Sequence, residues 1–309
     1  MAPRPGKPLP VADVDFSRLE QRGPDMAAVR RSCRGIASLP PLGRAAEVRL
    51  LLTALGCLDL TDLSATSTED TIRALGATAR RPLPPVLEDS LGAADLKVAA
   101  MCVYPSLVPA AAEALAGSGV RVAAAAGGFP DALSALSVRV TDVETAINLG
   151  ADEVDVPVNR GLVIEARYQD LYAELVKFRT AAPKAIMKVI LCAGDLPGAG
   201  ALYRTAWLAM AAGADFLKTS TGREATNATL SAGAVMGQAI LAFEEEHGRQ
   251  VGLKPAGGLK TPPDALDWLA LTDQALGPDA CQPHRFRIGA SSLAQALVER
   301  LAELDGPGA

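Results

Sequence analysis

The sequence predicts an α/β protein, a (β/α)8 TIM barrel with extra helices at its N-terminus. From about residue 56 onward, eight short apolar runs recur, and a segment with helical periodicity follows each of them. Most runs are uniformly hydrophobic, which is typical of strands that are buried on both faces of a parallel sheet. Their spacing is that of a βα repeat. An open doubly wound sheet is the alternative, but it would usually contain fewer strands.

The elements can be placed along the chain in order. The expected strands lie near residues 56–60, 97–103, 120–126, 153–158, 185–191, 215–219, 251–255 and 286–290. The helical segments that follow them lie near residues 67–79, 109–119, 140–150, 171–180, 202–213, 234–248, 262–271 and 293–304. Many of these segments end in glycine, as C-capped helices do. Others begin at Ser, Thr or tandem Pro, which are common at helix N-termini.

The first 50 residues differ from the rest of the 309-residue chain. They contain a proline-rich lead (residues 3–10) and then short amphipathic segments such as PDMAAVRRSCRGIAS. We expect residues 1–50 to form an N-terminal extension, partly flexible at its start, with short helices that pack on the outside of the barrel. Residues 51–309 would form the barrel, which is the catalytic domain.

Composition excludes several classes of protein. The net charge of −5 argues against a broad nucleic-acid or anionic-membrane surface, and no run of 18 apolar residues indicates a transmembrane helix. The N-terminus lacks the apolar run of a signal peptide. Five cysteines without C-x-x-C spacing are typical of reduced thiols in a cytosolic protein. We therefore expect a cytoplasmic protein with small-molecule partners, and a homo-oligomer, dimer or tetramer, stays open.

Common site motifs are also missing. With two histidines, His247 and His284, a zinc site built mainly on histidine is hard to assemble. The chain has no P-loop and no G-x-S-x-G elbow, and Tyr203 occupies the third glycine position of the nearest G-x-G-x-x-G. These gaps argue against a P-loop NTPase, a Rossmann cofactor site and a typical serine hydrolase.

Charged residues lie inside or at the ends of the apolar runs. They are three lysines and two aspartates: Lys188, Lys218, Lys254, Asp59 and Asp155. Such side chains are almost never buried unless they are paired, and barrels carry their chemistry at the C-terminal strand ends. One interpretation is a set of structural ion pairs. It explains single residues well, but not why so many fall on successive strands at one end.

The functional interpretation is imine chemistry. A lysine amine attacks a carbonyl only when it is neutral, and a second cation in a dry pocket lowers its pKa. Lys218 and Lys254, on adjacent strands, could supply this pair, and an aspartate two strands away could move protons. Spacing alone does not choose the nucleophile among Lys188, Lys218 and Lys254.

The loops after strands 6, 7 and 8 have the features of an anion site. Gly257-Gly258 would expose backbone N–H groups, and Ser291-Ser292 would begin a helix, where N–H groups and the dipole favour phosphate. Barrels commonly hold phosphate after strands 7 and 8. Arg223, in TGRE, would add a fixed cation. The alternative is plain turn glycines and a helix cap.

Eight segments, in order from about Gly56 to Leu293, resemble the deoxyribose-phosphate aldolase family. They are CLDLT, KVAAMCVYPSLV, GADEVDV, MKVIL, GADFLKTSTG, NAT, VGLKPAGG and FRIGASS. The N-terminal helices and DVPVNRGLV are more similar to its longer, animal-type branch. The resemblance implies a class I, Schiff-base aldolase without metal or other cofactor. It would reversibly cleave 2-deoxy-D-ribose 5-phosphate to acetaldehyde and D-glyceraldehyde 3-phosphate, in deoxynucleoside catabolism.

The resemblance also implies roles for residues. Lys218 of KTSTG would be the Schiff-base lysine, Lys254 of KPAGG the cation that perturbs it, and Asp155 of EVDV the proton-relay acid. Further pocket residues would be Asp59, Thr61, Lys188 and Cys102, although a cysteine in an apolar run by itself indicates a buried thiol. The phosphate would be held by Thr221, Gly222, Arg223, Gly257, Gly258, Ser291 and Ser292.

Some positions depart from the family pattern. Arg223 replaces the usual lysine of the TGK turn, Cys192-Ala193 stand where Glu-Thr is usual, and Pro157 stands where an apolar residue is usual. The last two bear on rate and pocket shape more than on reaction type. Two alternatives to the aldolase remain: a sugar-phosphate-binding barrel that has lost efficient chemistry, and a transaldolase-like Schiff-base enzyme.

Overall fold

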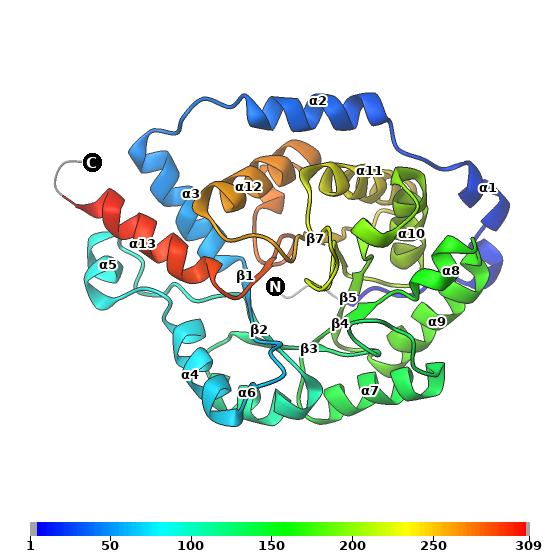
Figure 1. Ribbon diagram of the computed structural model, residues 1–309, viewed down its shortest axis with the longest axis horizontal. Helices are drawn as coiled ribbons and strands as arrows, with labels where there is room; N and C mark the ends of the chain where they lie inside the picture. The colour runs from blue at the N-terminus through cyan, green and yellow to red at the C-terminus, as the bar shows by residue number, and fades with distance from the viewer. Residues whose placement is uncertain (1–4, 307–309) are drawn as a thin grey trace.

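Eight parallel strands form the centre of the protein and helices surround them (Figure 1). The structure is a computed structural model that describes residues 5–306. The strands are β1 (Leu58–Thr61), β2 (Ala100–Val103), β3 (Arg121–Ala125), β4 (Glu153–Pro157), β5 (Ile186–Ile190), β6 (Phe216–Lys218), β7 (Gly252–Lys254) and β8 (Ile288–Ala290). All eight lie at the positions that the apolar runs predicted.

The sheet closes into a barrel. The strands are ordered β7-β6-β5-β4-β3-β2-β1-β8, so the first strand pairs with both the second and the last. Isolated bridges between Leu253 and Phe286 and between Ala256 and Gly289 connect β7 to the β8 segment. The predicted TIM barrel is therefore confirmed, and the open doubly wound sheet is excluded because the first strand pairs with the last and bridges join β7 to the β8 segment.

A helix follows each strand, as predicted. These helices are α4 (Glu69–Arg80), α6 (Val108–Leu115), α7 (Leu136–Asn148), α9 (Tyr168–Ala181), α10 (Ala199–Ala211), α11 (Leu230–His247), α12 (Pro262–Leu276) and α13 (Leu293–Asp305). The sequence did not predict α5 (Pro85–Ser90), α8 (Arg160–Ile164) or the short 3-10 turns η1 (Val11–Asp13), η2 (Pro105–Leu107), η3 (Ala193–Asp195) and η4 (Pro278–Ala280).

Side-chain caps fix where several helices begin. Thr68 and Thr261 each form a capping box at the start of α4 and α12, with Thr71 and Asp264 as the reciprocal partners. Thr229 accepts a hydrogen bond from the N–H of Ala232 and so starts α11 four residues before the predicted segment. These caps satisfy N–H groups that would otherwise lack a partner at the helix ends.

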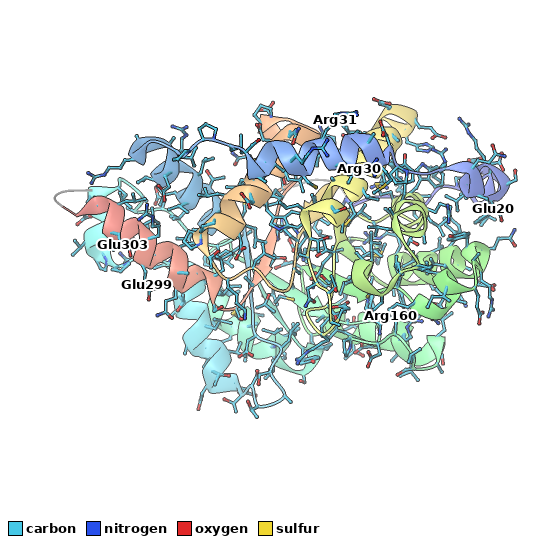
Figure 2. All side chains as sticks on the ribbon, turned by 45° about the horizontal axis from the view of Figure 1, so that its top comes forward. Glu20, Arg30, Arg31, Arg160, Glu299 and Glu303 are labelled. Atoms are coloured by element: carbon cyan, nitrogen blue, oxygen red, sulfur yellow. The ribbon has the colours of Figure 1, made fainter. Side chains whose placement is uncertain are left out.

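Three helices precede the barrel strands: α1 (Phe16–Gln21), α2 (Met26–Ala37) and α3 (Arg44–Gly56). Asp15 and Asp25 cap the first two. Helix α2 packs across α11 and α12 on the outside of the barrel, and α3 packs against α12 and α13 (Figure 1). Exposed charges such as Arg30, Arg31 and Glu299 point outward from α2 and α13 (Figure 2).

The proposed domain division, 1–50 and 51–309, stays a prediction. Its boundary falls inside α3, because the apolar face of that helix continues through Leu51, Ala54 and Leu55 into the core. Residues 1–4 of the predicted flexible lead, and 307–309 at the other end, lie outside the described residues. Within residues 5–306, no helix is long and apolar enough to span a membrane.

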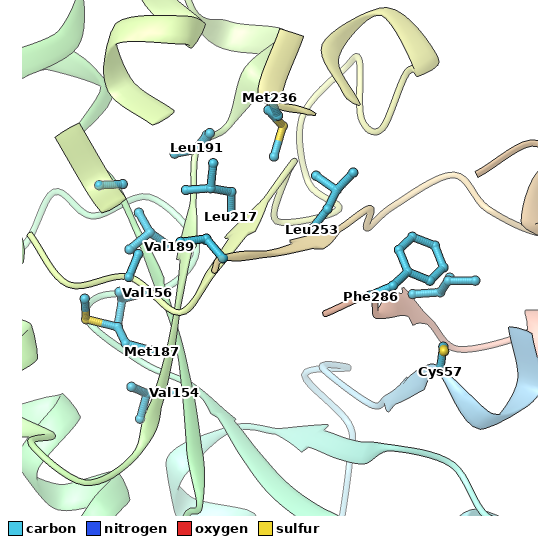
Figure 3. Packing of buried hydrophobic residues seen from close by; sticks show 14 of the residues in the cluster. Cys57, Val154, Val156, Met187, Val189, Leu191, Leu217, Met236, Leu253 and Phe286 are labelled. Carbon is cyan, nitrogen blue, oxygen red and sulfur yellow. The ribbon is translucent and has the colours of Figure 1, made fainter. Parts of the chain in front are cut away.

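The strands separate an apolar layer from a polar interior. Val154, Val156, Met187 and Val189 pack in the hydrophobic layer between the strands and the helices (Figure 3). Because side chains alternate along a strand, the intervening residues of β4 and β5 face the barrel axis. The charged residues of the apolar runs occupy these inward positions.

Candidate active site

Seven charged side chains gather inside the barrel, and each is nearly or completely buried. They are Asp59, Glu153, Asp155, Lys188, Lys218, Lys254 and Arg287. They come from β1, β4, β5, β6, β7 and the segment leading into β8. Strand register places Asp155 beside Lys188 and Lys218 beside Lys254. The sequence prediction that these aspartates and lysines lie together in the barrel agrees with this geometry.

Asp155 is at the centre of the cluster. Its Oδ1 accepts a hydrogen bond from Lys188 Nζ at 2.7 Å. Its Oδ2 accepts one from Lys218 Nζ and one from Lys254 Nζ, each at 2.7 Å. Two ammonium groups on adjacent strands therefore share a single carboxylate oxygen.

A second layer of ion pairs lies behind Asp155. Asp59 contacts Lys254 at 2.5 Å, Lys188 at 3.2 Å and Arg287 at 2.6 Å. Glu153 contacts Lys188 at 2.7 Å and accepts two hydrogen bonds from Arg287, at 2.9 and 3.1 Å. Every carboxylate in the cluster thus has at least two cationic partners, which is what buried charges require.

These contacts keep the carboxylates ionised. Burial opposes the charge of Asp155, but the nearby cations of Lys188, Lys218 and Lys254 outweigh it and hold the pKa of Asp155 well below its usual range. The pKa values of Asp59 and Glu153 are lowered in the same way.

The same balance acts on two of the lysines. Burial favours a neutral amine, yet the adjacent carboxylates raise the pKa of Lys254 and raise that of Lys188 well above its ordinary value. Both lysines are therefore cations.

A cavity of about 450 Å³ opens above the cluster at the C-terminal ends of the strands. Most of the predicted substrate and phosphate residues line it: Thr61, Lys218, Thr221, Gly222, Arg223, Gly257, Gly258, Ser291 and Ser292. Asp59, Cys102, Asp155, Lys188 and Lys254 do not line it but lie buried in the barrel interior. Lys218 is therefore the point where the buried charge cluster reaches the cavity.

The walls around Lys218 are small and apolar. Cys102 packs in a cluster with Ala100, Ala123 and Ala125, its Sγ lies 3.9 Å from Asp155 Oδ2, and burial raises the pKa of its thiol. The ring of Phe129 lies 5.9 Å from Lys218 Nζ. Cys102 is accordingly a buried thiol behind the cavity, and its part in substrate binding stays a prediction.

A larger cavity, of about 800 Å³, lies at the opposite end of the strands, between α3 and the loops that enter the barrel. Its two buried charged residues, Glu153 and Arg287, are bonded to each other and to the cluster. Since barrels place their chemistry at the C-terminal strand ends, we assign function to the smaller cavity that contains Lys218.

Comparison with known proteins shows the family of the chain. The model of the DeoC/LacD family aldolases matches residues 72–293. The chain belongs to this aldolase family. It is 39% identical to the deoxyribose-phosphate aldolase of Bos taurus over 93% of this chain and 92% of that one.

Solved structures support the same fold. A putative deoxyribose-phosphate aldolase from Coccidioides immitis superposes with a TM-score of 0.69 at 24% identity, covering 94% of this chain and 99% of that one. A deoxyribose phosphate aldolase from Aeropyrum pernix, described as a tetramer, gives a TM-score of 0.59 at 23% identity, covering 85% and 100% of the two chains.

In this aldolase-family chain, the loops around the cavity are held by specific contacts. Arg223 Nη2 donates to the carbonyl of Leu63 at 2.7 Å, so its side chain reaches across to the loop after β1. Gly257 and Gly258 have φ values of 80° and 87°, which glycine adopts without strain. A Cβ on Gly222 would lie 4.0 Å from the Cα of Gly257, so the turns after β6 and β7 are in close contact.

The residues that depart from the family pattern can be located in the structure. Cys192 adopts a left-handed backbone with φ of 53°, and its Sγ lies 3.3 Å from Arg160 Nη1. Pro157 ends β4, opposite Ile190. Neither position lines the cavity with Lys218.

Sequence reasoning missed four residues of this region: Glu153, Arg287, Glu224 and Lys260. Glu153 and Arg287 carried a usable signal, because each is a charge inside a short apolar run, as the three lysines are. Lys260 lines the cavity beside the glycine turn. Glu224 accepts hydrogen bonds from the turn after β6, and no local sequence pattern predicts these contacts. Within residues 5–306, no three His, Cys, Asp or Glu side chains are grouped to hold a metal ion.

Proposed function

We propose that this chain is a deoxyribose-phosphate aldolase, a lyase that works through a Schiff base. It would reversibly cleave 2-deoxy-D-ribose 5-phosphate to acetaldehyde and D-glyceraldehyde 3-phosphate. The observation that carries the proposal is the position of Lys218: its amine lies at the cavity and shares one oxygen of Asp155 with Lys254. Family membership supports the same reaction.

The first step is formation of an imine. Lys218 gives up a proton, and its neutral amine adds to C1 of the open-chain sugar. Asp155 is the contacting acceptor for that proton. Once Lys218 is neutral, one of the three cations that lower the pKa of Asp155 is gone, so the carboxylate binds a proton more readily. It can return the proton as the carbinolamine loses water.

Lys254 is proposed as the cation that favours this step. Two ammonium groups on one oxygen repel each other, and conversion of Lys218 to an amine removes that repulsion. Lys254 keeps its charge through Asp59 and Asp155, both within hydrogen-bonding distance. It is therefore a stable partner rather than a second nucleophile.

Cleavage then breaks the C2–C3 bond. The hydroxyl on C3 loses its proton, the aldehyde of glyceraldehyde 3-phosphate forms, and the bonding electrons move into the iminium to give an enamine. The enamine is protonated at C2, and water releases acetaldehyde and regenerates Lys218. Positioned acid–base help of the kind Asp155 offers typically contributes about 10²–10⁴ in rate.

The phosphate would bind at the rim of the cavity. Arg223, Gly257, Gly258, Ser291 and Ser292 are the proposed ligands, supported by their place around the same cavity as Lys218. Lys260 adds a cation beside them. Loop N–H groups and a helix start suit a phosphate dianion.

The test is release of acetaldehyde from deoxyribose 5-phosphate. With acetaldehyde and borohydride, one ethyl group should become fixed on Lys218, because a reduced imine cannot hydrolyse. A label mapped to Lys188 or Lys254 would overturn the assignment. Phosphosugar binding without turnover would favour the alternative of a binding barrel, and use of a ketose donor in place of acetaldehyde would favour a transaldolase-like enzyme.

The wider setting is also part of the proposal. We place the enzyme in the cytoplasm, in deoxynucleoside catabolism, without a metal or other cofactor. A homo-oligomer, dimer or tetramer, is consistent with the tetramer described for the Aeropyrum pernix protein. The helices of residues 1–50 would form an extension on the catalytic barrel of residues 51–309.

A further inference from the structure

The turn after β6, residues 221–223, binds an anion that is part of the protein itself, the carboxylate of Glu224. The carboxylate of Glu224 accepts hydrogen bonds from the N–H of Thr221 at 2.9 Å, of Gly222 at 3.1 Å and of Arg223 at 3.2 Å. It also accepts one from the hydroxyl of Thr221 at 2.9 Å. Three successive N–H groups that converge on one carboxylate form an anion-binding concavity of the kind that also binds phosphate.

Glu224 is bound firmly as an anion. Burial opposes its charge, but the N–H and hydroxyl groups of Thr221 and a contact with Cys192 lower the pKa of Glu224 below its ordinary value. Burial raises the pKa of the Cys192 thiol to about 12, and this neutral thiol donates to the carbonyl of Ile190, with its Sγ 3.9 Å from that oxygen. Arg160, which contacts Cys192, lies at the start of α8 (Figure 2).

The occupied turn forms one wall of the cavity that contains Lys218. Thr221, Gly222 and Arg223 line it, and the glycine turn after β7 lies on the adjoining wall. In the described chain, the N–H groups of Gly257 and Gly258 donate to no acceptor. The anion site therefore has one set of donors that is free and one set that is engaged.

We propose that Glu224 is a specificity-determining residue: an internal carboxylate that competes with the substrate's phosphate for the N–H groups of residues 221–223. This inference rests on the proposed function only for the identity of the substrate. An N–H group directed at Glu224 cannot donate fully to a phosphate oxygen at the same time, and the two anions repel each other. Phosphate binds the free donors at Gly257 and Gly258 and gains those of the 221–223 turn only as Glu224 releases them.

The competition predicts a measurable cost for phosphorylated ligands. Removing the charge of Glu224 should tighten phosphate binding by about fivefold, the size of one like-charge contact under strong solvent screening. Glu224→Gln is suited to the test, because the amide keeps the size of the side chain and one acceptor oxygen while losing the charge. Glu224→Ala is the second variant and should change affinity in the same direction.

A matched control removes an equivalent carboxylate elsewhere. Asp25 also accepts hydrogen bonds from two backbone N–H groups, those of Ala27 and Ala28, but it caps α2 on the outside of the barrel. Asp25→Asn loses the same charge and keeps a good helix cap. It should leave phosphate affinity unchanged.

The experiment measures binding of inorganic phosphate to the full chain by isothermal titration calorimetry, with thermal melting to establish that each variant is folded. We expect both Glu224 variants to bind phosphate more tightly than the unchanged chain and Asp25→Asn to match it. Equal or weaker binding by a folded Glu224→Gln chain would show that the carboxylate only shapes the turn, and the proposal would be wrong.

Kinetics separate this inference from the proposed function. For Glu224→Gln, the ratio of KM for deoxyribose 5-phosphate to KM for unphosphorylated deoxyribose should fall by about the same fivefold. If no variant releases acetaldehyde but phosphate binding still tightens, the aldolase proposal fails and the role of Glu224 stands. If turnover is present and phosphate binding does not tighten, the aldolase proposal stands and the proposed role of Glu224 fails.

Discussion

The pair of Glu153 and Arg287 should be essential for the stability of the charge cluster, and Glu153→Gln is the change that tests it. Glu153 is completely buried and neutralises Arg287 and Lys188 together. With all seven groups ionised, the cluster has four cations and three carboxylates, a net charge of +1, and the substitution raises it to +2. Removing one partner of a buried ion pair costs about 3–5 kcal/mol, because the remaining charges lose their compensation.

That cost is large against a typical free energy of unfolding of about 5–15 kcal/mol. Urea denaturation followed by circular dichroism should show it as a lower midpoint with an unchanged slope. The control is Glu153→Gln combined with Arg287→Met, which removes a cation as well and should recover part of the loss. A loss below about 1 kcal/mol for the single variant, or strictly additive losses in the double variant, would refute this account of the cluster.

The pH dependence of stability gives a second measure of how much the pair of Glu153 and Arg287 contributes to the free energy of unfolding. The folded-state pKa of Glu153 is lowered, so its contribution is present above its unfolded pKa, about 4.3, and is lost as pH falls through the lower folded value. The Glu153→Gln chain should therefore lose less stability than the unchanged chain when pH is lowered below about 4. Equal acid sensitivity of the two chains would contradict the assignment.

Three further predictions concern the chemistry. Arg223→Ala should lower kcat/KM by about tenfold or more for the phosphorylated sugar relative to deoxyribose, because a charge-assisted hydrogen bond contributes about 1.5–3 kcal/mol. Arg223→Lys should have nearly the kcat/KM of the unchanged chain. Equal losses of kcat/KM on both sugars for Arg223→Ala would mean that Arg223 has a structural role. Activity should survive exhaustive EDTA, since an imine supplies the electron sink, and loss on chelation with recovery by zinc would be inconsistent with a Schiff-base enzyme. Lys218→Ala should abolish acetaldehyde release while circular dichroism shows an intact fold, and retained turnover would exclude Lys218 as the nucleophile.

The fold could be predicted from the sequence because its signals are local. Each strand is a short apolar run, and each following helix has its own periodicity and caps, as Thr68 and Thr261 illustrate. The N-terminal boundary stays a prediction and falls within α3, which begins with the polar Arg44, ends at Gly56 and has Leu55 in the core. No periodicity marks the point at which an outer helix becomes the entry to β1.

Part of the site could also be predicted, because some of its residues have a local signal in the sequence. Lys188, Lys218 and Lys254 were visible as charges in apolar surroundings, and Glu153 and Arg287 had the same signal. What sequence could not provide was the pairing among them, which depends on strand register across the whole barrel. Contacts such as Glu224 with the turn before it depend on the backbone angles of three residues.

The structure also gives a physical reason to choose among the three lysines, which spacing left open. Lys188 contacts three carboxylates, those of Asp59, Glu153 and Asp155, and is fully buried. An amine in that position would leave these carboxylates undercompensated, and no substrate carbonyl could reach it. Lys254 is also fully buried and held by two carboxylates. Lys218 has one carboxylate partner and lines the cavity, so of the three it is the amine that a substrate can reach, which supports the proposal that Lys218 is the nucleophile.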